Sequence, residues 1–344
     1  MSGASTADTT VSVIICAYTE ERWQPLVEAI EGVRAQTRPA EQVVVVIDHN
    51  DDLLARVRER FTPLGVIVTA NPGQRGISGA RNHGVAKSSG EIVVFLDDDA
   101  TPYPDWLAQL TKHYADPGIY GVGGGLVARW ETGRQPRWIP QEFYWTLSCN
   151  YRGLPTTQAP VRNLIGGNMS IRRSTFVALG GLQDGLGRLG TIPLGCEDTE
   201  FCIRLHRHYP SAILLHEPDA LVSHLATATR TRPRYFLTRC WDEGRSKAIV
   251  ARLVGTTAGL ASERYYTFFI LPTGVLLHLG AVVRHGDIAG VGRAAMIVAG
   301  LALTTGGYLR GRLSMLGGRF QLSPTVPPNP VAGVGEAAAI DAHP

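Results

Sequence analysis

The sequence predicts an open α/β sheet with mostly parallel strands, and two observations carry this prediction. Short apolar, β-branched runs alternate with helical segments through about the first hundred residues. Each run is apolar throughout instead of alternating with polar residues, which is typical of parallel strands covered on both faces. A repeated β-α-β order favours such a sheet. Ligands of such sheets bind at the carboxyl ends of the strands.

The first half of the chain supplies these elements in order. A polar leader precedes the first strand at 11–16. A helix is predicted over 24–36, because Leu26, Ile30 and Val33 recur at helical spacing. The other predicted elements are strands at 43–47, 66–68 and 92–96 and helices at 51–61 and 78–87, the last with Ser78 as its N-cap.

The second half is less regular. A strand is expected over 120–130 and an irregular aromatic excursion over 138–151. A helix over 197–209 and a short strand at 213–215 follow. These boundaries divide the chain into a flexible leader (1–10), an α/β domain (11–228), a basic and apolar helical region (229–320) and a disordered tail (321–344).

Composition excludes several classes of protein. The 344 residues carry a formal charge of only +3, so nucleic acid is not an expected partner. The five cysteines are scattered and form no CxxC pair, which argues against a disulfide framework or structural zinc. The first ten residues lack a basic and apolar signal pattern, and a cytoplasmic location is expected.

Three consecutive carboxylates, Asp97, Asp98 and Asp99, follow a predicted buried strand directly. Carboxylates this close repel one another unless a cation lies among them, and Mg²⁺ or Mn²⁺ takes oxygen ligands of this kind. The pattern therefore indicates a divalent metal bridged to a phosphorylated substrate. The alternative is an acidic surface turn, because aspartate also forms turns.

A second acidic pair, Glu197 and Asp198, opens a predicted helix. The helix dipole favours carboxylates there, so the pair could simply stabilise the helix start, together with a Glu200–Arg204 pair. A carboxylate in this place could also accept a proton from a substrate hydroxyl.

Several nucleotide-binding and hydrolase patterns are missing from the sequence. The turn after the first strand has no glycine, which disfavours a dinucleotide-binding fingerprint. A P-loop lysine and a Gly-x-Ser-x-Gly elbow are also absent, so P-loop kinases and α/β-hydrolases are disfavoured.

Together the motifs resemble those of the family 2 glycosyltransferases, which have the GT-A fold. The resemblance covers about residues 10 to 225. The matching segments are VSVIICAYTEE, VVVVIDHN, RGISGARNHGVAKSSGEIVVFLDDDATPYPDWL, GGNMSIRRSTFVALGG and GCEDTEFCIRL.

This resemblance implies a nucleotide-sugar donor, a divalent metal (Mn²⁺ or Mg²⁺), and inversion at the sugar's anomeric carbon by single displacement. Asp198 matches the family's catalytic base. The residues implied at the donor are Ala17, Tyr18, Glu20, Asp48, Arg75, Arg81, Asp97 and Asp98. Those implied at the metal are Asp99, Asp97 and His224, and those at the acceptor are Gly167, Asn168 and Glu197.

One position departs from the family pattern, because His49 stands where many members have a second aspartate. Either Asp48 and Asn50 suffice to hold the donor's base, or the base contact differs and UDP cannot be assumed. His224 is also open to two interpretations, as a metal or diphosphate contact or as a structural histidine.

The C-terminal region suggests a membrane. Seven basic residues lie between Arg230 and Arg252, and the uncharged stretches 265–283 and 294–309 follow. A spanning hairpin, a monotopic docking surface and a buried helical appendage all fit. We expect association with the inner membrane surface. The first arginines could instead fold over the donor diphosphate, or the basic segment could be a solvated helix face.

The sequence thus predicts a metal-dependent, inverting hexosyltransferase that acts on a hydroxyl of a glycan or lipid-linked acceptor in cell-surface polysaccharide or glycolipid synthesis. Two alternative functions remain compatible with the sequence. One is a non-catalytic nucleotide-binding or scaffold protein of the same fold. The other is a sugar nucleotidyltransferase, which usually has a Gly-rich loop after the first strand that this chain lacks.

Overall fold

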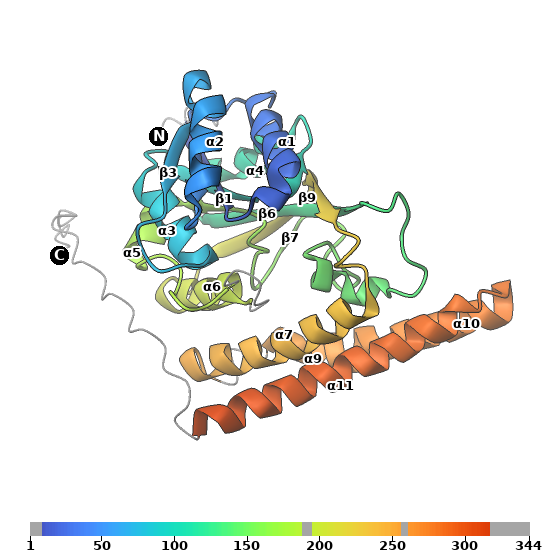
Figure 1. Cartoon of the computed structure of the whole chain (residues 1–344). Helices are drawn as coiled ribbons and strands as arrows, with labels where there is room; N and C mark the ends of the chain where they lie inside the picture. The colour runs from blue at the N-terminus through green and yellow to red at the C-terminus, as the bar shows by residue number, and fades with distance from the viewer. Residues whose placement is uncertain (1–8, 188–194, 256–260, 317–344) are drawn as a thin grey trace, which may run out of the picture.

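The computed structural model describes residues 9–187, 195–255 and 261–316. The predicted tail and most of the predicted leader lie outside the described residues. Within them, the chain forms one mixed sheet of nine strands with helices on both faces (Figure 1). The strands are β1 (Val11–Ala17), β2 (Gln42–Ile47), β3 (Ile67–Ala70), β4 (Ile92–Asp97), β5 (Ala100–Pro102), β6 (Ile119–Trp130), β7 (Ala159–Pro160), β8 (Asn168–Arg172) and β9 (Ile213–Ala226).

The predicted α/β sheet is confirmed, and it is mixed: the parallel half expected from the first hundred residues is extended by antiparallel pairs. The strand order is β3-β2-β1-β4-β8-β6-β9-β5, with β7 beside β9. Strands β1 to β4 pair in parallel, as do β6 and β9, whereas β8 runs antiparallel to both β4 and β6. The register sets Cys16 of β1 beside Asp97 of β4, so the strand ends that carry polar residues meet at one edge.

Alternate residues of the strands face two apolar layers, because successive side chains of a strand point to opposite faces. Val13 and Ile15 of β1 pack with one helical layer, and Ile14 packs with the other. The first layer holds α1 (Trp23–Arg34), α2 (Asp51–Phe61) and α4 (Trp106–Thr111). The second holds α3 (Ile77–Ala86), α5 (Arg173–Ala178) and α6 (Glu197–His208).

Two local predictions were wrong. Helix α3 begins after Gly76, and the Ser78 hydroxyl is not its cap but donates to the Leu186 carbonyl. The strand expected at 213–215 continues to Ala226, because residues after Pro218 resume pairing with β6. The aromatic excursion contains a 3₁₀ helix, η4 (Gln141–Leu147). The remaining short helices are η1 (Glu20–Arg22), η2 (Thr62–Leu64) and η3 (Lys112–Ala115).

Helices from the C-terminal region form a further layer beneath the sheet (Figure 1). Helix α7 (Pro233–Leu253) contacts α6 and η4, and α11 (Ala289–Leu316) runs beside it. Between them come α9 (Ala261–Tyr265), one π-helical segment η5 (Tyr266–Ile270) and α10 (Leu271–His285). An apolar cluster that includes Phe143 of η4, Phe236 of α7, Leu271 of α10 and Ile297 of α11 joins this layer to the rest.

Candidate active site

A cavity of about 480 Å³ opens at the carboxyl ends of β1, β2 and β4. It is lined by eight carboxylates and six cationic side chains, so carboxylates are in excess by two. Among the predicted site residues, those that line it are Ala17, Tyr18, Asp48, Arg81, Asp97, Asp98, Asp99, Gly167, Glu197 and Asp198.

The structure brings Asp97, Asp99 and His224 together. One ligand atom from each lies within 4.8 Å of the others. His224 Nε2 is 3.1 Å from Asp99 Oδ1 and 3.6 Å from Asp97 Oδ2. His224 reaches this place because β9 pairs with β5, directly after the three aspartates, with His224 opposite Ala100.

The electrostatics keep Asp97 and Asp99 ionised. Burial acts to raise the pKa of Asp99, but the charges of His224 and Arg230 together hold that pKa well below its usual range. Burial also acts to raise the pKa of Asp97. The hydrogen bond from His224 and the charge of Arg81 outweigh it, so the pKa of Asp97 is lowered. Although burial opposes it, the same carboxylates raise the pKa of His224. Two ionised carboxylates and one imidazole nitrogen, freed when His224 gives up its proton, form a donor set that fits a divalent cation such as Mn²⁺.

The middle aspartate, Asp98, has a different partner. Arg22 Nη1 lies 2.5 Å from Asp98 Oδ1 and 3.2 Å from Asp99 Oδ2. Burial raises the pKa of Asp98 to about 7, although the charge of Arg22 opposes this shift. Arg230 Nη1 also contacts Asp99, at 3.2 Å. Arg22 was not predicted from the sequence. The feature that could have indicated it is its position in the short helix η1, directly after the end of β1.

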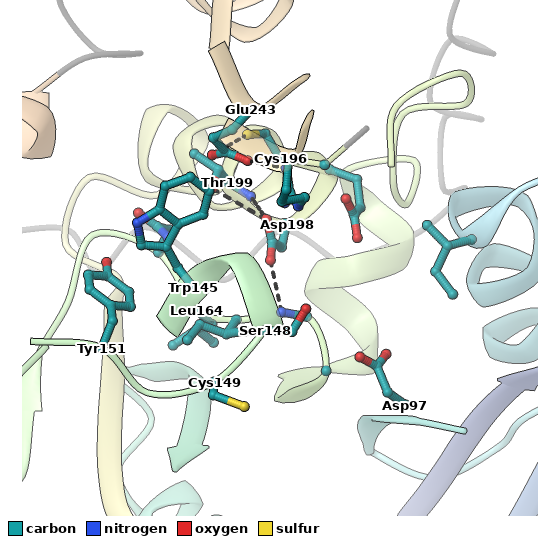
Figure 2. Close-up of a pocket in the computed structure, with 18 of the residues that line it drawn as sticks. Asp97, Trp145, Ser148, Cys149, Tyr151, Leu164, Cys196, Asp198, Thr199 and Glu243 are labelled. Carbon is teal, nitrogen blue, oxygen red and sulfur yellow. Dashed lines mark hydrogen bonds and ion pairs between the residues drawn. The ribbon is translucent and has the colours of Figure 1, made fainter. Parts of the chain in front are cut away.

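The carboxylate of Asp198 is fixed by backbone donors. The Gly166 N–H donates to Asp198 Oδ2 at 2.8 Å, and the Thr199 N–H donates to Oδ1 at 2.6 Å. Burial raises the pKa of Asp198, and these two hydrogen bonds oppose that rise. In Figure 2, Asp198 lies between Asp97 on one side and Trp145 and Tyr151 on the other. A carboxylate so held is positioned to accept a proton.

Arg81 links the two acidic groups. Its guanidinium donates to Asp97 Oδ1 and to Glu197 Oε1, each at 3.0 Å, and to the Gly166 carbonyl. Burial and the neighbouring Asp198 charge raise the pKa of Glu197 to about 7, against the charge of Arg81. A Cβ at Gly167 would lie 2.5 Å from Asp97 Oδ2, so a glycine is needed for this close approach.

Asp48 closes the other end of the cavity. Its carboxylate accepts hydrogen bonds from the Gly76 N–H at 2.9 Å and the Asn71 amide at 2.7 Å, and it lies 3.0 Å from His49 Nδ1. His49 has a positive φ of 54°, which is uncommon for a residue other than glycine. Its carbonyl accepts a hydrogen bond from Arg75.

Four predicted site residues do not line the cavity: Glu20, Arg75, Asn168 and His224. Glu20 and Arg75 are exposed on the surface near it. Asn168 is fully buried behind it, where its side chain holds the backbone of Gly125 and Ala220 and accepts a hydrogen bond from Trp106. His224 lies behind the aspartates that it contacts.

Comparison with known proteins gives a consistent result. The sequence model described as "Glycosyl transferase family 2" matches residues 12–180. The glucosyl-dolichyl phosphate glucuronosyltransferase of Haloferax volcanii is 31% identical over 306 residues, which cover 88% of this chain and 96% of that protein. The pre-mycofactocin glycosyltransferase of Mycobacterium tuberculosis is 29% identical over 257 residues, 73% of this chain but 49% of that protein.

Among solved structures, a mannosyltransferase of Pyrobaculum calidifontis in complex with GDP-Man and Mn²⁺ has a similar fold. Its TM-score is 0.55 at 20% identity, and the match covers 86% of this chain and 87% of that one. This likeness supports the fold expected from the sequence.

Proposed function

The chain belongs to glycosyl transferase family 2, and from this premise we propose that it transfers a sugar, with inversion, from a nucleotide-sugar donor to a lipid-linked sugar acceptor. Its glycosyltransferase relatives make it an enzyme of this type, so the scaffold and nucleotidyltransferase alternatives lose their support. The observation that carries the proposal is the placement of an Asp-Asp-His cluster and the Asp198 carboxylate in and around one cavity.

In the proposed donor site, Asp97, Asp99 and His224 would hold the divalent ion. When bound, such an ion neutralises charge on a leaving diphosphate. Arg22 and Arg230 lie against the same aspartates and would add positive charge beside the diphosphate. Asp48, Ala17 and Tyr18 would bind the nucleoside. The imidazole in the donor set favours Mn²⁺ over Mg²⁺, which prefers oxygen ligands alone.

In the proposed reaction, Asp198 removes the proton from an acceptor hydroxyl. The hydroxyl oxygen forms its bond to the anomeric carbon as the bond to the diphosphate oxygen breaks on the opposite face. The configuration of that carbon is thereby inverted, without a covalent intermediate. The two backbone hydrogen bonds orient the carboxylate, and its burial makes it a stronger base than an exposed aspartate.

The acceptor proposal rests on the relative from Haloferax volcanii, whose name specifies a glucosyl-dolichyl phosphate. That protein is matched over nearly its whole length, including the C-terminal helices. Two segments, Glu263–His285 and Ala289–Met315, are also long and apolar enough to cross a membrane, judged by length and composition.

We infer, however, that this helical pair lies along the membrane surface. Near its start, Glu263 pairs with Lys247 of α7 at 2.7 Å. After α10 ends, Asp287 pairs at 2.9 Å with Arg137, a residue between β6 and η4. Within α10, His278 lies 3.2 Å from the buried Glu142 carboxylate. The residues just before and just after α10 therefore both contact the rest of the chain. A helix that spanned the membrane would place one of its two ends on the opposite side, out of reach of such contacts.

The exposed face of these helices fits a lipid surface. Large apolar side chains point to solvent, among them Phe268, Phe269, Leu276 and Val283. Arg264 and Arg284 flank them and could contact anionic headgroups.

The donor proposal is tested by incubating the full-length protein with UDP-, GDP- and dTDP-sugars. Release of the nucleoside diphosphate is followed with Mn²⁺, with Mg²⁺ and with a chelator. We expect one nucleotide class to be cleaved with Mn²⁺, and Asp99→Asn to abolish the metal response. Cleavage that is equally fast with the chelator would contradict the metal-dependent proposal.

A further inference from the structure

Beyond Asp198, the same cavity is lined by residues that the proposed donor site does not use. We define this lipid arm by six cavity-lining residues of η4, α7, η5 and α11: Trp145, Arg239, Glu243, Lys247, Ile270 and Leu301. It lies on the side of Asp198 that faces away from Asp97, as the positions of Trp145 and Glu243 in Figure 2 show.

We propose that the lipid arm binds the phosphate and the first isoprenoid-like segment of a lipid-linked sugar, with the sugar itself at Asp198. This inference rests on the proposed function and names the part of the chain that would recognise the acceptor. A single displacement needs the acceptor hydroxyl on the face opposite the leaving diphosphate. The arm is on that side of Asp198.

The polar residues of the arm form a chain of contacts that begins beside the proposed base. Cys196 donates to Glu243 Oε1 at 3.3 Å, and Glu243 pairs with Arg239 at 2.9 Å. Lys247 lies 3.5 Å from Glu243 and 2.7 Å from Glu263. Residues 239, 243 and 247 recur every fourth position, so they share one face of α7.

The charges of the arm suit a phosphodiester. Arg162 and Glu263 line the same cavity, so that the cations Arg239, Lys247 and Arg162 exceed the carboxylates Glu243 and Glu263 by one positive charge. Although burial opposes it, the charges of Glu263 and Glu243 raise the pKa of Lys247, which therefore stays protonated at neutral pH. A sugar joined to a lipid through one phosphate carries a single negative charge.

The far end of the arm is apolar. Ile270 and Leu271 of the η5–α10 junction and Leu301 of α11 line it, and Leu271 and Leu301 belong to the apolar cluster of Phe143 and Phe236. Aromatic side chains stand between this end and Asp198, where Trp145 Nε1 donates to the Tyr266 hydroxyl at 3.1 Å. Polar and aromatic walls near the base and an apolar end against the membrane-facing helices match the order sugar, phosphate, hydrocarbon.

The test measures binding without turnover. Full-length protein in non-ionic detergent is titrated with phytanyl phosphate, with phytanol and with inorganic phosphate, and its thermal unfolding midpoint is recorded. We expect phytanyl phosphate to raise the midpoint, and the alcohol and inorganic phosphate to raise it far less. Equal effects of phytanyl phosphate and inorganic phosphate would show an anion site only and overturn the proposal, as would no effect of phytanyl phosphate.

Variants locate the site. Lys247→Met should weaken phytanyl phosphate binding at least about tenfold, while Arg252→Gln, an exposed cation of the same helix, should leave it unchanged. Ile270→Trp, which fills the apolar end, gives a second variant should Lys247→Met fail to fold. Equal loss in Lys247→Met and Arg252→Gln would reveal general charge attraction and contradict the site. Binding of Mn²⁺ and nucleotide, measured in parallel, reports on the donor site separately.

Discussion

At the scale of single residues, His224 is the most informative side chain, because it joins the aspartates from a distant strand. We predict that His224→Ala weakens Mn²⁺-dependent nucleotide binding at least about tenfold, since one of the three proposed metal ligands is lost. Calorimetric titration with Mn²⁺ and nucleotide measures this.

The matched control is His216→Ala, a second buried histidine of β9 that lies away from the aspartate cluster. It should leave both affinities unchanged. Wild-type affinities in the His224→Ala protein would show that His224 is structural.

Glu197 gives a pH-dependent prediction. Its pKa is raised by burial from the usual 4.5 to about 7, so the folded protein holds a proton there that the unfolded chain has lost. The free energy of unfolding therefore falls as pH rises through that window. In metal-free protein, Glu197→Gln should show a shallower fall between pH 5 and 7.5 by denaturant titration. Because Asp98 shifts in the same direction, some slope remains. Identical slopes in both proteins would refute the assignment.

The three aspartates were predicted from a local feature, the end of a buried strand, and Asp198 and His224 were predicted through the family resemblance. Arg22 was not predicted, because its contacts with Asp98 and Asp99 join residues more than seventy positions apart. Asn168 was expected at the acceptor, but its neighbours Trp106, Gly125 and Ala220 come from other elements that no local pattern specifies.

At the scale of elements, α7 and α11 pack through glycines. A Cβ at Gly307 would lie 2.0 Å from the Trp241 carbonyl, and one at Gly244 would lie 2.0 Å from that of Thr304. Gly307→Ala should therefore lower the free energy of unfolding by about 1–3 kcal/mol. Denaturant titration in detergent measures the change.

The control lies on the same helix. Nothing stands within 4 Å of a Cβ at Gly292, so Gly292→Ala should stabilise the helix by about 0.5–1 kcal/mol. Opposite signs for the two alanines are expected. If Gly307→Ala is as stable as Gly292→Ala, α7 and α11 do not pack in this way.

Helix and strand positions in the first hundred residues followed from apolar periodicity, and the helix 51–61 was predicted at its observed bounds. The length of strand β9 was underestimated because Pro218 and Asp219 interrupt its run of apolar residues. Pairing with β6 continues the strand beyond them. The apolar segments were correctly expected as helical candidates. The packing of α11 against α7 depends on glycines whose partners are far away in sequence.

At the scale of the whole molecule, the proposal that α10 and α11 lie along the membrane surface predicts that both ends of α10 are on the same side of the membrane. All five native cysteines are buried, so labelling of the folded protein by a thiol reagent can be assigned to a single engineered cysteine. In sealed inverted membrane vesicles, Arg264→Cys and His285→Cys should both react with an impermeant maleimide. Arg60→Cys, on exposed α2, serves as the positive control for the catalytic side. Labelling of position 264 but not 285 until detergent is added would show that α10 spans.

Asp198 is the proposed base of a metal-dependent sugar transfer. The most direct measurement is acceptor-dependent release of nucleoside diphosphate by wild-type protein and Asp198→Asn, with Mn²⁺, the preferred donor and a polyprenyl phosphate bearing one sugar. We predict a loss of at least about 100-fold in rate with donor affinity retained, because the asparagine keeps a similar shape but cannot accept the proton. Transfer by Asp198→Asn at the wild-type rate would show that Asp198 is not the base.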